Sequence, residues 1–162
     1  MVDNTQNILD SRDVIERLEE LQMVRETYVE EIEDCENTAK DTGDERTQDE
    51  HNAADAALAE ARAALVAWDA GDDGNELRAL IALAEEGENS PDWNYGETLI
   101  REDYFTSYIE ELIADCYPTS KEMNSGDWPW RHMSLDYDAA ADEARADYFE
   151  LDFAGVTYLL RA

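Results

Sequence analysis

The sequence predicts an α+β fold that is mainly helical: an N-terminal antiparallel helical hairpin, then a small helical domain with a C-terminal β-hairpin. Two stretches carry apolar residues at steps of four and three, the spacing of one helix face. Of the 15 Phe, Trp and Tyr residues, 13 lie between Trp93 and Tyr158, which predicts a well-packed C-terminal core. We therefore expect a hairpin over 1–70 that serves for dimerisation, a short helix and connecting loop over 71–97, and an acidic α+β domain over 98–162.

The first helix of the hairpin is predicted from Ser11 to about Ala39. The stretch Lys40–Arg46 holds a glycine and no large apolar residue, so we expect a turn there. Small residues on one helix that face large ones on the other would allow the two helices of the hairpin to pack closely. The stripe of the first helix is Val14, Leu18, Leu21, Tyr28, Ile32, Cys35 and Ala39, broken only by Arg25, and that of the second is Ala54, Leu58, Ala61, Leu65 and Trp68.

The rest of the chain is divided by its Gly and Pro residues and by changes of period. Residues 98–101 fit either a short strand or the start of a helix, and we leave both open. The predicted elements are a break at Gly71–Gly74, a helix capped by Asn75 and ending at Glu86, a loop over 87–95, a helix over 103–116, a loop over 119–134, a short helix over 138–145 and a hairpin over 149–160.

The charge of the chain limits its function more than any motif does. It holds 42 Asp and Glu against 12 Lys and Arg, a formal net charge of −30. The acids are spread evenly, with 20 in residues 1–70 and 22 in residues 71–162, which favours a charged surface over an acidic tail. B-DNA carries one charge per roughly 1.7 Å of axis, so thirty charges match about 50 Å of duplex. A folded protein of this kind is adapted either to brine or to resemble nucleic acid.

Several classes of protein are not expected because the sequence lacks the features that they require. No apolar run approaches the ~20 residues of a membrane span. The first residues lack the basic and apolar regions of a signal peptide. The two cysteines, Cys35 and Cys116, give no disulfide framework and suit a reducing compartment. We expect a cytoplasmic protein, in the host cytoplasm if a phage encodes it.

The sequence offers no catalytic or metal-binding pattern. The only histidines, His51 and His132, lack ligand spacing to each other and to the cysteines. The segment that begins at Asp69 resembles a calcium loop, but its twelfth position is Leu80 where a bidentate Glu is needed. No phosphate loop or nucleophile motif occurs, and no basic patch could neutralise nucleic-acid phosphates. We predict no enzyme activity, no metal, no cofactor and no nucleic-acid binding.

Acidic residues form rows at helical spacing, where neighbours lie roughly 5–6 Å apart between Cβ atoms, close to the spacing of phosphates along a strand. One row alone is a solvated helix face, but three rows with few lysine partners favour a functional surface. The first helix carries Glu16, Glu19, Glu20, Glu26, Glu30, Glu33 and Asp34. The candidate partner-binding carboxylates of the C-terminal half are Glu102, Asp103, Glu110, Glu111, Asp115, Asp136, Asp138, Asp142, Glu143, Asp147, Glu150 and Asp152.

Residues 98–162 resemble the C-terminal domain of ArdA-type antirestriction proteins and related small acidic phage proteins. The resemblance rests on Tyr104–Tyr108, Glu110–Asp115, Leu135–Asp138, Ala141–Asp147 and the closing aromatic hairpin. It implies an elongated dimer that mimics bent DNA and occupies the DNA site of a type I restriction enzyme. The first 90 residues do not resemble the other domains of that family, so a CRISPR effector or another DNA-processing complex is an equally reasonable target.

The leading interpretation is a DNA-mimic inhibitor from a phage or mobile element that binds a DNA-binding protein of a host defence system. The alternative is a halophile cytoplasmic protein, since ten Arg against two Lys fits a brine-adapted surface. A third is a helical-hairpin assembly module. We expect a homodimer without membrane contact, in which the hairpin sets the dimer and residues 98–152 supply most of the mimicry. The dimer contacts are predicted at Val14, Leu18, Leu21, Tyr28 and Ile32.

Overall fold

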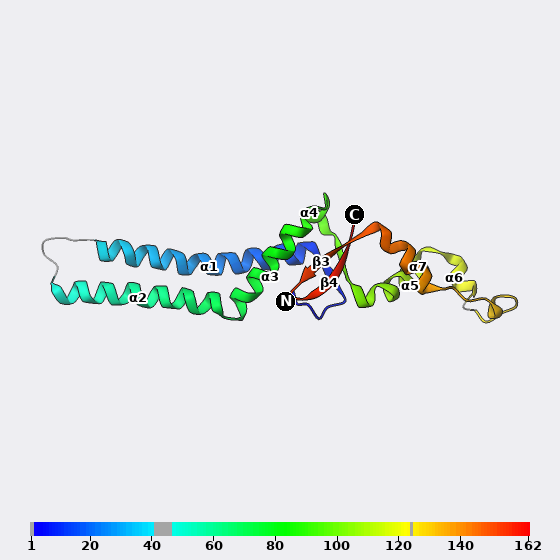
Figure 1. Ribbon diagram of the computed structural model, residues 1–162, viewed down its shortest axis with the longest axis horizontal. Helices are drawn as coiled ribbons and strands as arrows, with labels where there is room; N and C mark the ends of the chain where they lie inside the picture. Colours follow the sequence, from blue (N-terminus) through cyan, green and yellow to red (C-terminus); the bar gives the residue numbers. More distant parts are fainter. Residues whose placement is uncertain (1, 41–46, 124) are drawn as a thin grey trace. The chain divides into compact units, whose positions relative to one another are not determined.

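The computed structural model describes residues 2–40, 47–123 and 125–162, and its fold is α+β and mainly helical, as predicted (Figure 1). The predicted turn at Lys40–Arg46 falls largely on residues 41–46, outside the described ranges. The elements in chain order are β1 (Ile8–Asp10), α1 (Ser11–Lys40), α2 (Gln48–Ala70), α3 (Asp72–Gly87), α4 (Trp93–Gly96), β2 (Thr98–Arg101), the 3₁₀ turn η1 (Glu102–Tyr104), α5 (Phe105–Cys116), α6 (Pro118–Met123), η2 (Trp130–His132), α7 (Tyr137–Ala144), η3 (Arg145–Asp147), β3 (Tyr148–Phe153) and β4 (Val156–Arg161).

The chain forms two compact units, which we describe separately. Unit 1 combines Met1–Val14 with Ala82–Ala162, and unit 2 is Ile15–Ile81. This division differs from the three consecutive parts that the sequence suggested. The reason is β1, which pairs with β2 and so joins the first residues of the chain to its C-terminal part.

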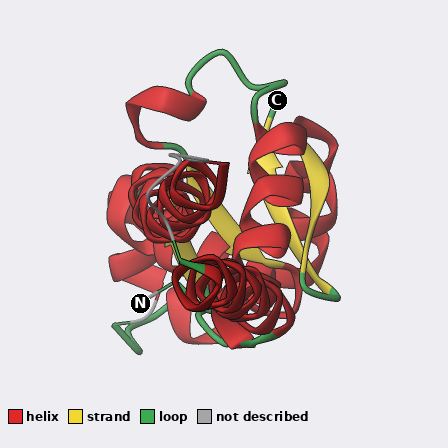
Figure 2. Cartoon of the chain, turned by 90° about the vertical axis from the view of Figure 1, so that its left-hand side faces the viewer, coloured by secondary structure: helices red, strands yellow, loops and turns green. Residues whose placement is uncertain are grey.

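Unit 2 contains the predicted antiparallel hairpin, whose helices α1 and α2 lie side by side (Figures 1 and 2). Two ion pairs connect the helices: Arg25 Nε lies 2.9 Å from Asp69 Oδ1, and Arg62 Nη2 lies 2.8 Å from Glu36 Oε1. The α2 helix begins with a capping box in which Thr47 Oγ1 and Glu50 each accept a backbone N–H of the other. The small residues of the α2 stripe face inward as expected, because Ala54 and Ala61 are both buried.

The third helix begins earlier than the sequence predicted. We expected Asn75 to cap it, but α3 begins at Asp72, and the Asn75 side chain accepts a hydrogen bond from Arg78 Nη2 at 2.5 Å. The break between α2 and α3 is therefore confined to Gly71, whose N–H donates to Trp68 O at 3.0 Å. The predicted loops over 87–95 and 119–134 also contain short helices, namely α4, α6 and η2.

Unit 1 is built on a four-stranded antiparallel sheet of order β1-β2-β4-β3. The expected C-terminal hairpin is present, with Phe153 opposite Val156 across a two-residue turn. Both turn residues have positive φ, 50° at Ala154 and 81° at Gly155, the conformation that follows the twist of the flanking strands. Residues 98–101, which fitted either a strand or the start of a helix, form strand β2. Strand β1 was not predicted from the sequence.

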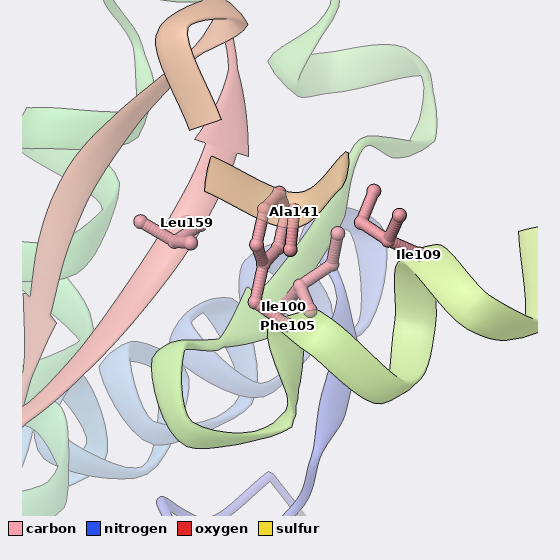
Figure 3. Close-up of a cluster of buried hydrophobic side chains, with 5 residues drawn as sticks. All are labelled: Ile100, Phe105, Ile109, Ala141 and Leu159. Carbon is pink, nitrogen blue, oxygen red and sulfur yellow. The ribbon is translucent and has the colours of Figure 1, made fainter. Parts of the chain in front are cut away.

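One core of unit 1 holds α5 and α7 against the sheet (Figure 3). Phe105 and Ile109 of α5 are four residues apart and therefore share one face of the helix. The Phe105 ring also meets the ring of Tyr148 edge-on, with centroids 4.9 Å apart. The buried members are Ile100 from β2, Phe105 and Ile109 from α5, Ala141 from α7 and Leu159 from β4.

A second buried contact in unit 1 surrounds Trp93, which is 2% exposed. Ser11, fully buried at the start of α1, donates from Oγ to Trp93 O at 2.6 Å and accepts from the N–H of Glu97 at 2.8 Å. Gly87 lies so close to the indole that a Cβ there would be 2.4 Å from Trp93 Cζ3. Position 87 therefore has no room for a side chain.

Candidate acidic recognition surface

The twelve candidate carboxylates of the C-terminal half all belong to unit 1, and all twelve are exposed. We call this set the carboxylate surface. Its members lie on η1 and α5 (Glu102, Asp103, Glu110, Glu111, Asp115), at the start of α7 and along it (Asp136, Asp138, Asp142, Glu143), and on η3 and β3 (Asp147, Glu150, Asp152).

The exposure of these acids follows from the amphipathic pattern of α5 and α7. In α5, Phe105 and Ile109 are buried, so Glu110 and Glu111 lie outside the buried stripe. In α7, Ala141 alone is fully buried, and its small side chain permits close packing of α7 against α5. The core thus fixes two adjacent helices whose outer faces carry carboxylates.

One arginine, Arg145, pairs with two acids of the surface at once. The Arg145 guanidinium bonds both Glu102 and Glu150, with 2.8 Å from Nη2 to Glu150 Oε1. These two hydrogen bonds, that of Glu102 first, raise the pKa of Arg145 above its usual range. No role for Arg145 was predicted from the sequence. A cation inside a row of acids is the signal that could have identified it.

Four further carboxylates make contacts within the chain. Glu111 accepts from the Tyr104 hydroxyl at 2.8 Å, which raises the pKa of that tyrosine because the bond favours its neutral form. Asp136 caps α7 by accepting from the N–H of Ala139 at 3.0 Å. The remaining two contacts are Asp103 Oδ1 with Arg101 Nε at 3.0 Å and Asp152 Oδ1 with the N–H of Gly155 at 3.2 Å.

Six members of the carboxylate surface make neither an ion pair nor a side-chain hydrogen bond with any residue that the structure describes. We call these six the free carboxylates. A new cation could bind them without breaking an existing contact. They are Glu110, Asp115, Asp138, Asp142, Glu143 and Asp147.

The acidic row of α1 is a separate candidate. Glu20 of this row is paired with Arg17, whose Nη1 lies 3.1 Å from Glu20 Oε2. Six exposed glutamates of α1 make no such contact within the described part of the chain. They are Glu16, Glu19, Glu26, Glu30, Glu31 and Glu33.

The structure corrects part of the predicted dimer contact. Val14 and Leu21 are 0% and 2% exposed, so in this conformation the chain itself covers them and they cannot contact a second copy. Leu18, Tyr28 and Ile32 are half-buried, and the Tyr28 ring lies 6.1 Å from that of Trp68 between centroids. For these three residues a dimer contact stays a prediction.

A cavity of about 310 Å³ in unit 1 was not suggested by the sequence. Tyr108, Tyr148, Glu97 and Arg161 bring polar groups to it from four different elements or their ends. Burial, and then the neighbouring Tyr108, raise the pKa of Tyr148, because both favour its neutral, protonated form.

Residues 2–40, 47–123 and 125–162 hold neither a metal-binding cluster nor a membrane-spanning helix. Within those ranges no three His, Cys, Asp or Glu side chains are grouped so as to hold a metal ion. Over the same ranges, no helix has the length and apolar composition needed to cross a bilayer. Cys35 is half-buried, Cys116 is exposed, and both are free thiols.

The chain was compared with known proteins at the level of sequence and of fold. No family model, no curated protein and no solved structure matches it.

Proposed function

We propose that this chain is a DNA-mimic inhibitor, encoded by a phage or mobile element, that occupies the DNA-binding site of a host defence complex. The observation that carries the proposal is the carboxylate surface: twelve exposed acids on elements packed around one core, six of them without a partner among the described residues. The resemblance of residues 98–162 to ArdA-type proteins supports the same function.

The inhibitor acts by competition. Lysine and arginine side chains of a DNA groove pair with the free carboxylates as they would pair with phosphates, and counterions are released as they are from DNA. The packed aromatic core holds α5 and α7 in place, which lowers the entropic cost of binding. The target is a restriction enzyme or a CRISPR effector, and the inhibitor functions as a homodimer in the cytoplasm.

An electrophoretic competition assay tests this function. Purified type I restriction enzymes and CRISPR effector complexes are each bound to labelled duplex DNA, and the full chain is added as competitor. We expect release of the DNA from at least one complex, with a strong dependence on salt. Failure to displace DNA from every complex at low salt contradicts the proposal.

Brine adaptation is the second candidate function, favoured by the ten Arg against two Lys. In that case the carboxylates keep the protein hydrated at high salt, and their mutual repulsion unfolds it at low salt. A thermal melt followed by circular dichroism at about 50 mM and at multimolar salt separates the two, since repulsion between exposed charges is screened within a Debye length. A DNA mimic stays folded at the lower salt concentration.

A further inference from the structure

The segment between α6 and α7 presents large apolar side chains to solvent. Trp128 is 74% exposed, Met133 is 54% exposed and Leu135 is 38% exposed. We call these three residues the apolar loop. Trp93, by contrast, is 2% exposed, so the fold does bury an indole where packing requires it. A tryptophan buries a large area when it is covered, which makes its exposure informative.

The same segment interrupts the negative charge of the chain. Residues 128–135 contain no Asp or Glu, and their ionisable residues are Arg131 and His132, although 42 of the 162 residues of the chain are acidic. Directly after the segment, Asp136 begins the acidic stretch of α7. Residues 128–135, which include the apolar loop, are therefore a neutral to basic segment. This segment adjoins the carboxylate surface along the chain.

Several hydrogen bonds of the backbone form within the loop. The N–H of Arg131 donates to Asp127 O at 2.8 Å, and the N–H of Met133 donates to Trp130 O at 2.9 Å. The N–H of Asp127 donates to the Ser125 hydroxyl at 3.2 Å. These hydrogen bonds restrict the backbone of the loop, which lowers the entropy that its side chains lose on binding compared with an unbonded loop.

We propose that the apolar loop anchors this chain to the target of its proposed function by entering an apolar recess beside the basic DNA-binding groove of that protein. The inference rests on the DNA-mimic function and adds to it a contact that DNA does not make. Carboxylate rows resemble any DNA, so they cannot by themselves select one target. A tryptophan in an apolar recess is typical of the few residues that dominate an interface, and it would supply the selection.

A second copy of this chain fits the loop poorly. Three side chains cannot bury the roughly 600 Å² per partner that a stable interface needs, so neighbouring surface has to take part. The neighbouring surface on α7 carries Asp138 and Asp142, which repel the same surface of another copy but pair with a basic partner. Charge complementarity therefore favours the DNA-binding protein.

The test replaces all three loop residues in the full chain, Trp128→Ser with Met133→Ser and Leu135→Ser. A matched control replaces exposed apolar residues elsewhere, Tyr95→Ser with Val66→Ser, which are 78% and 68% exposed. Affinity is measured by competition against labelled duplex DNA on the restriction or CRISPR complex that the unaltered chain displaces from DNA. We expect about 30-fold weaker binding for the loop variant and no change for the control. The salt dependence stays that of the unaltered chain, because no ion pair is removed.

Each possible result supports or refutes the anchoring role of the apolar loop. If the unaltered chain displaces DNA but the loop variant binds equally well, the anchor is refuted and the DNA-mimic function stands. If the unaltered chain displaces DNA from no complex, both fail. A loop variant with altered salt dependence refutes the anchor, as does a changed molar mass in light scattering, which would assign the loop to self-association. If the triple variant has a lower melting temperature than the unaltered chain, Trp128→Ser alone gives the same comparison with the smallest change to the fold.

Discussion

Neutralising the six free carboxylates is the most direct test of how the proposed inhibitor works. The variant carries Glu→Gln at 110 and 143 and Asp→Asn at 115, 138, 142 and 147, and changes the formal net charge from −30 to −24. The six side chains are exposed and make no ion pair within the described part of the chain, so their neutralisation breaks no ion pair there. Their removal also relieves like-charge repulsion, and we expect a melting temperature no lower than that of the unaltered chain.

The expected loss of affinity follows from the exposure of these groups. An exposed ion pair contributes about 0.5 kcal/mol, so six pairs contribute about 3 kcal/mol, or about a hundredfold in dissociation constant. If the carboxylates replace phosphates, each pair also contributes about 0.9 to the slope of log affinity against log salt, and the slope falls by about 5.

The matched control neutralises six acids of α1 by Glu→Gln at 16, 19, 26, 30, 31 and 33. It produces the same net charge, and these residues are likewise exposed and without a partner among the described residues. Affinity is measured by the competition assay at several salt concentrations between about 50 and 200 mM. A control that weakens binding as much as the test variant refutes the assignment of the contact to α5, α7 and η3. An unchanged salt slope in the test variant refutes the mimicry itself.

Three further variants test the structure of unit 1. Ser11→Ala removes the hydroxyl that bonds both Trp93 O and the N–H of Glu97, and we expect it to lower the free energy of unfolding by about 2 kcal/mol in urea titration. Gly87→Ala places a Cβ against the buried indole, where overpacking should cost about 1–3 kcal/mol by the same measurement. Burial raises the pKa of Tyr148 above about 10, so its contribution to stability is complete below that pH and is lost as pH rises through the folded pKa. Tyr148→Phe should therefore reduce the fall in melting temperature between pH 9 and pH 11.

The controls for these variants come from exposed positions. Ser107→Ala and Tyr95→Phe alter residues that are solvent-exposed, and neither should change stability or its dependence on pH. Stability unchanged by Ser11→Ala would show that the bonds to Trp93 and Glu97 are replaced by water. A Gly87→Ala chain as stable as the original would show that the indole can move. If the melting temperature of Tyr148→Phe falls as much between pH 9 and pH 11 as that of the unaltered chain, the loss of stability belongs to another tyrosine. Tyr158 is one such residue, because burial also raises its pKa.

Part of the candidate site could be predicted from the sequence. The outward position of Glu110 and Glu111 follows from the stripe that begins at Phe105, because a helix places residues three and four apart on one face. Which carboxylates are free could not be predicted in the same way. Arg145 pairs with Glu102, 43 residues away, and no local pattern indicates that contact. A loop over 119–134 was predicted from the sequence, but only the structure showed Trp128 to be exposed while Trp93 is buried.

The sequence by itself determined the long helices, the C-terminal hairpin and the even acidic surface, since each depends on residues close together in the chain. Periods of 3.6 and 2 and the Ala154–Gly155 turn are local signals. Only the tertiary structure decided how the strands pair in the sheet and how the chain divides into two units. Strands β1 and β2 have three and four residues, too few for a recognisable alternation, and Leu9 and Leu99 become partners through pairing across 90 residues of sequence. That pairing is stabilised by burial, since both leucines lie in the interior, and burial depends on what the whole chain brings together.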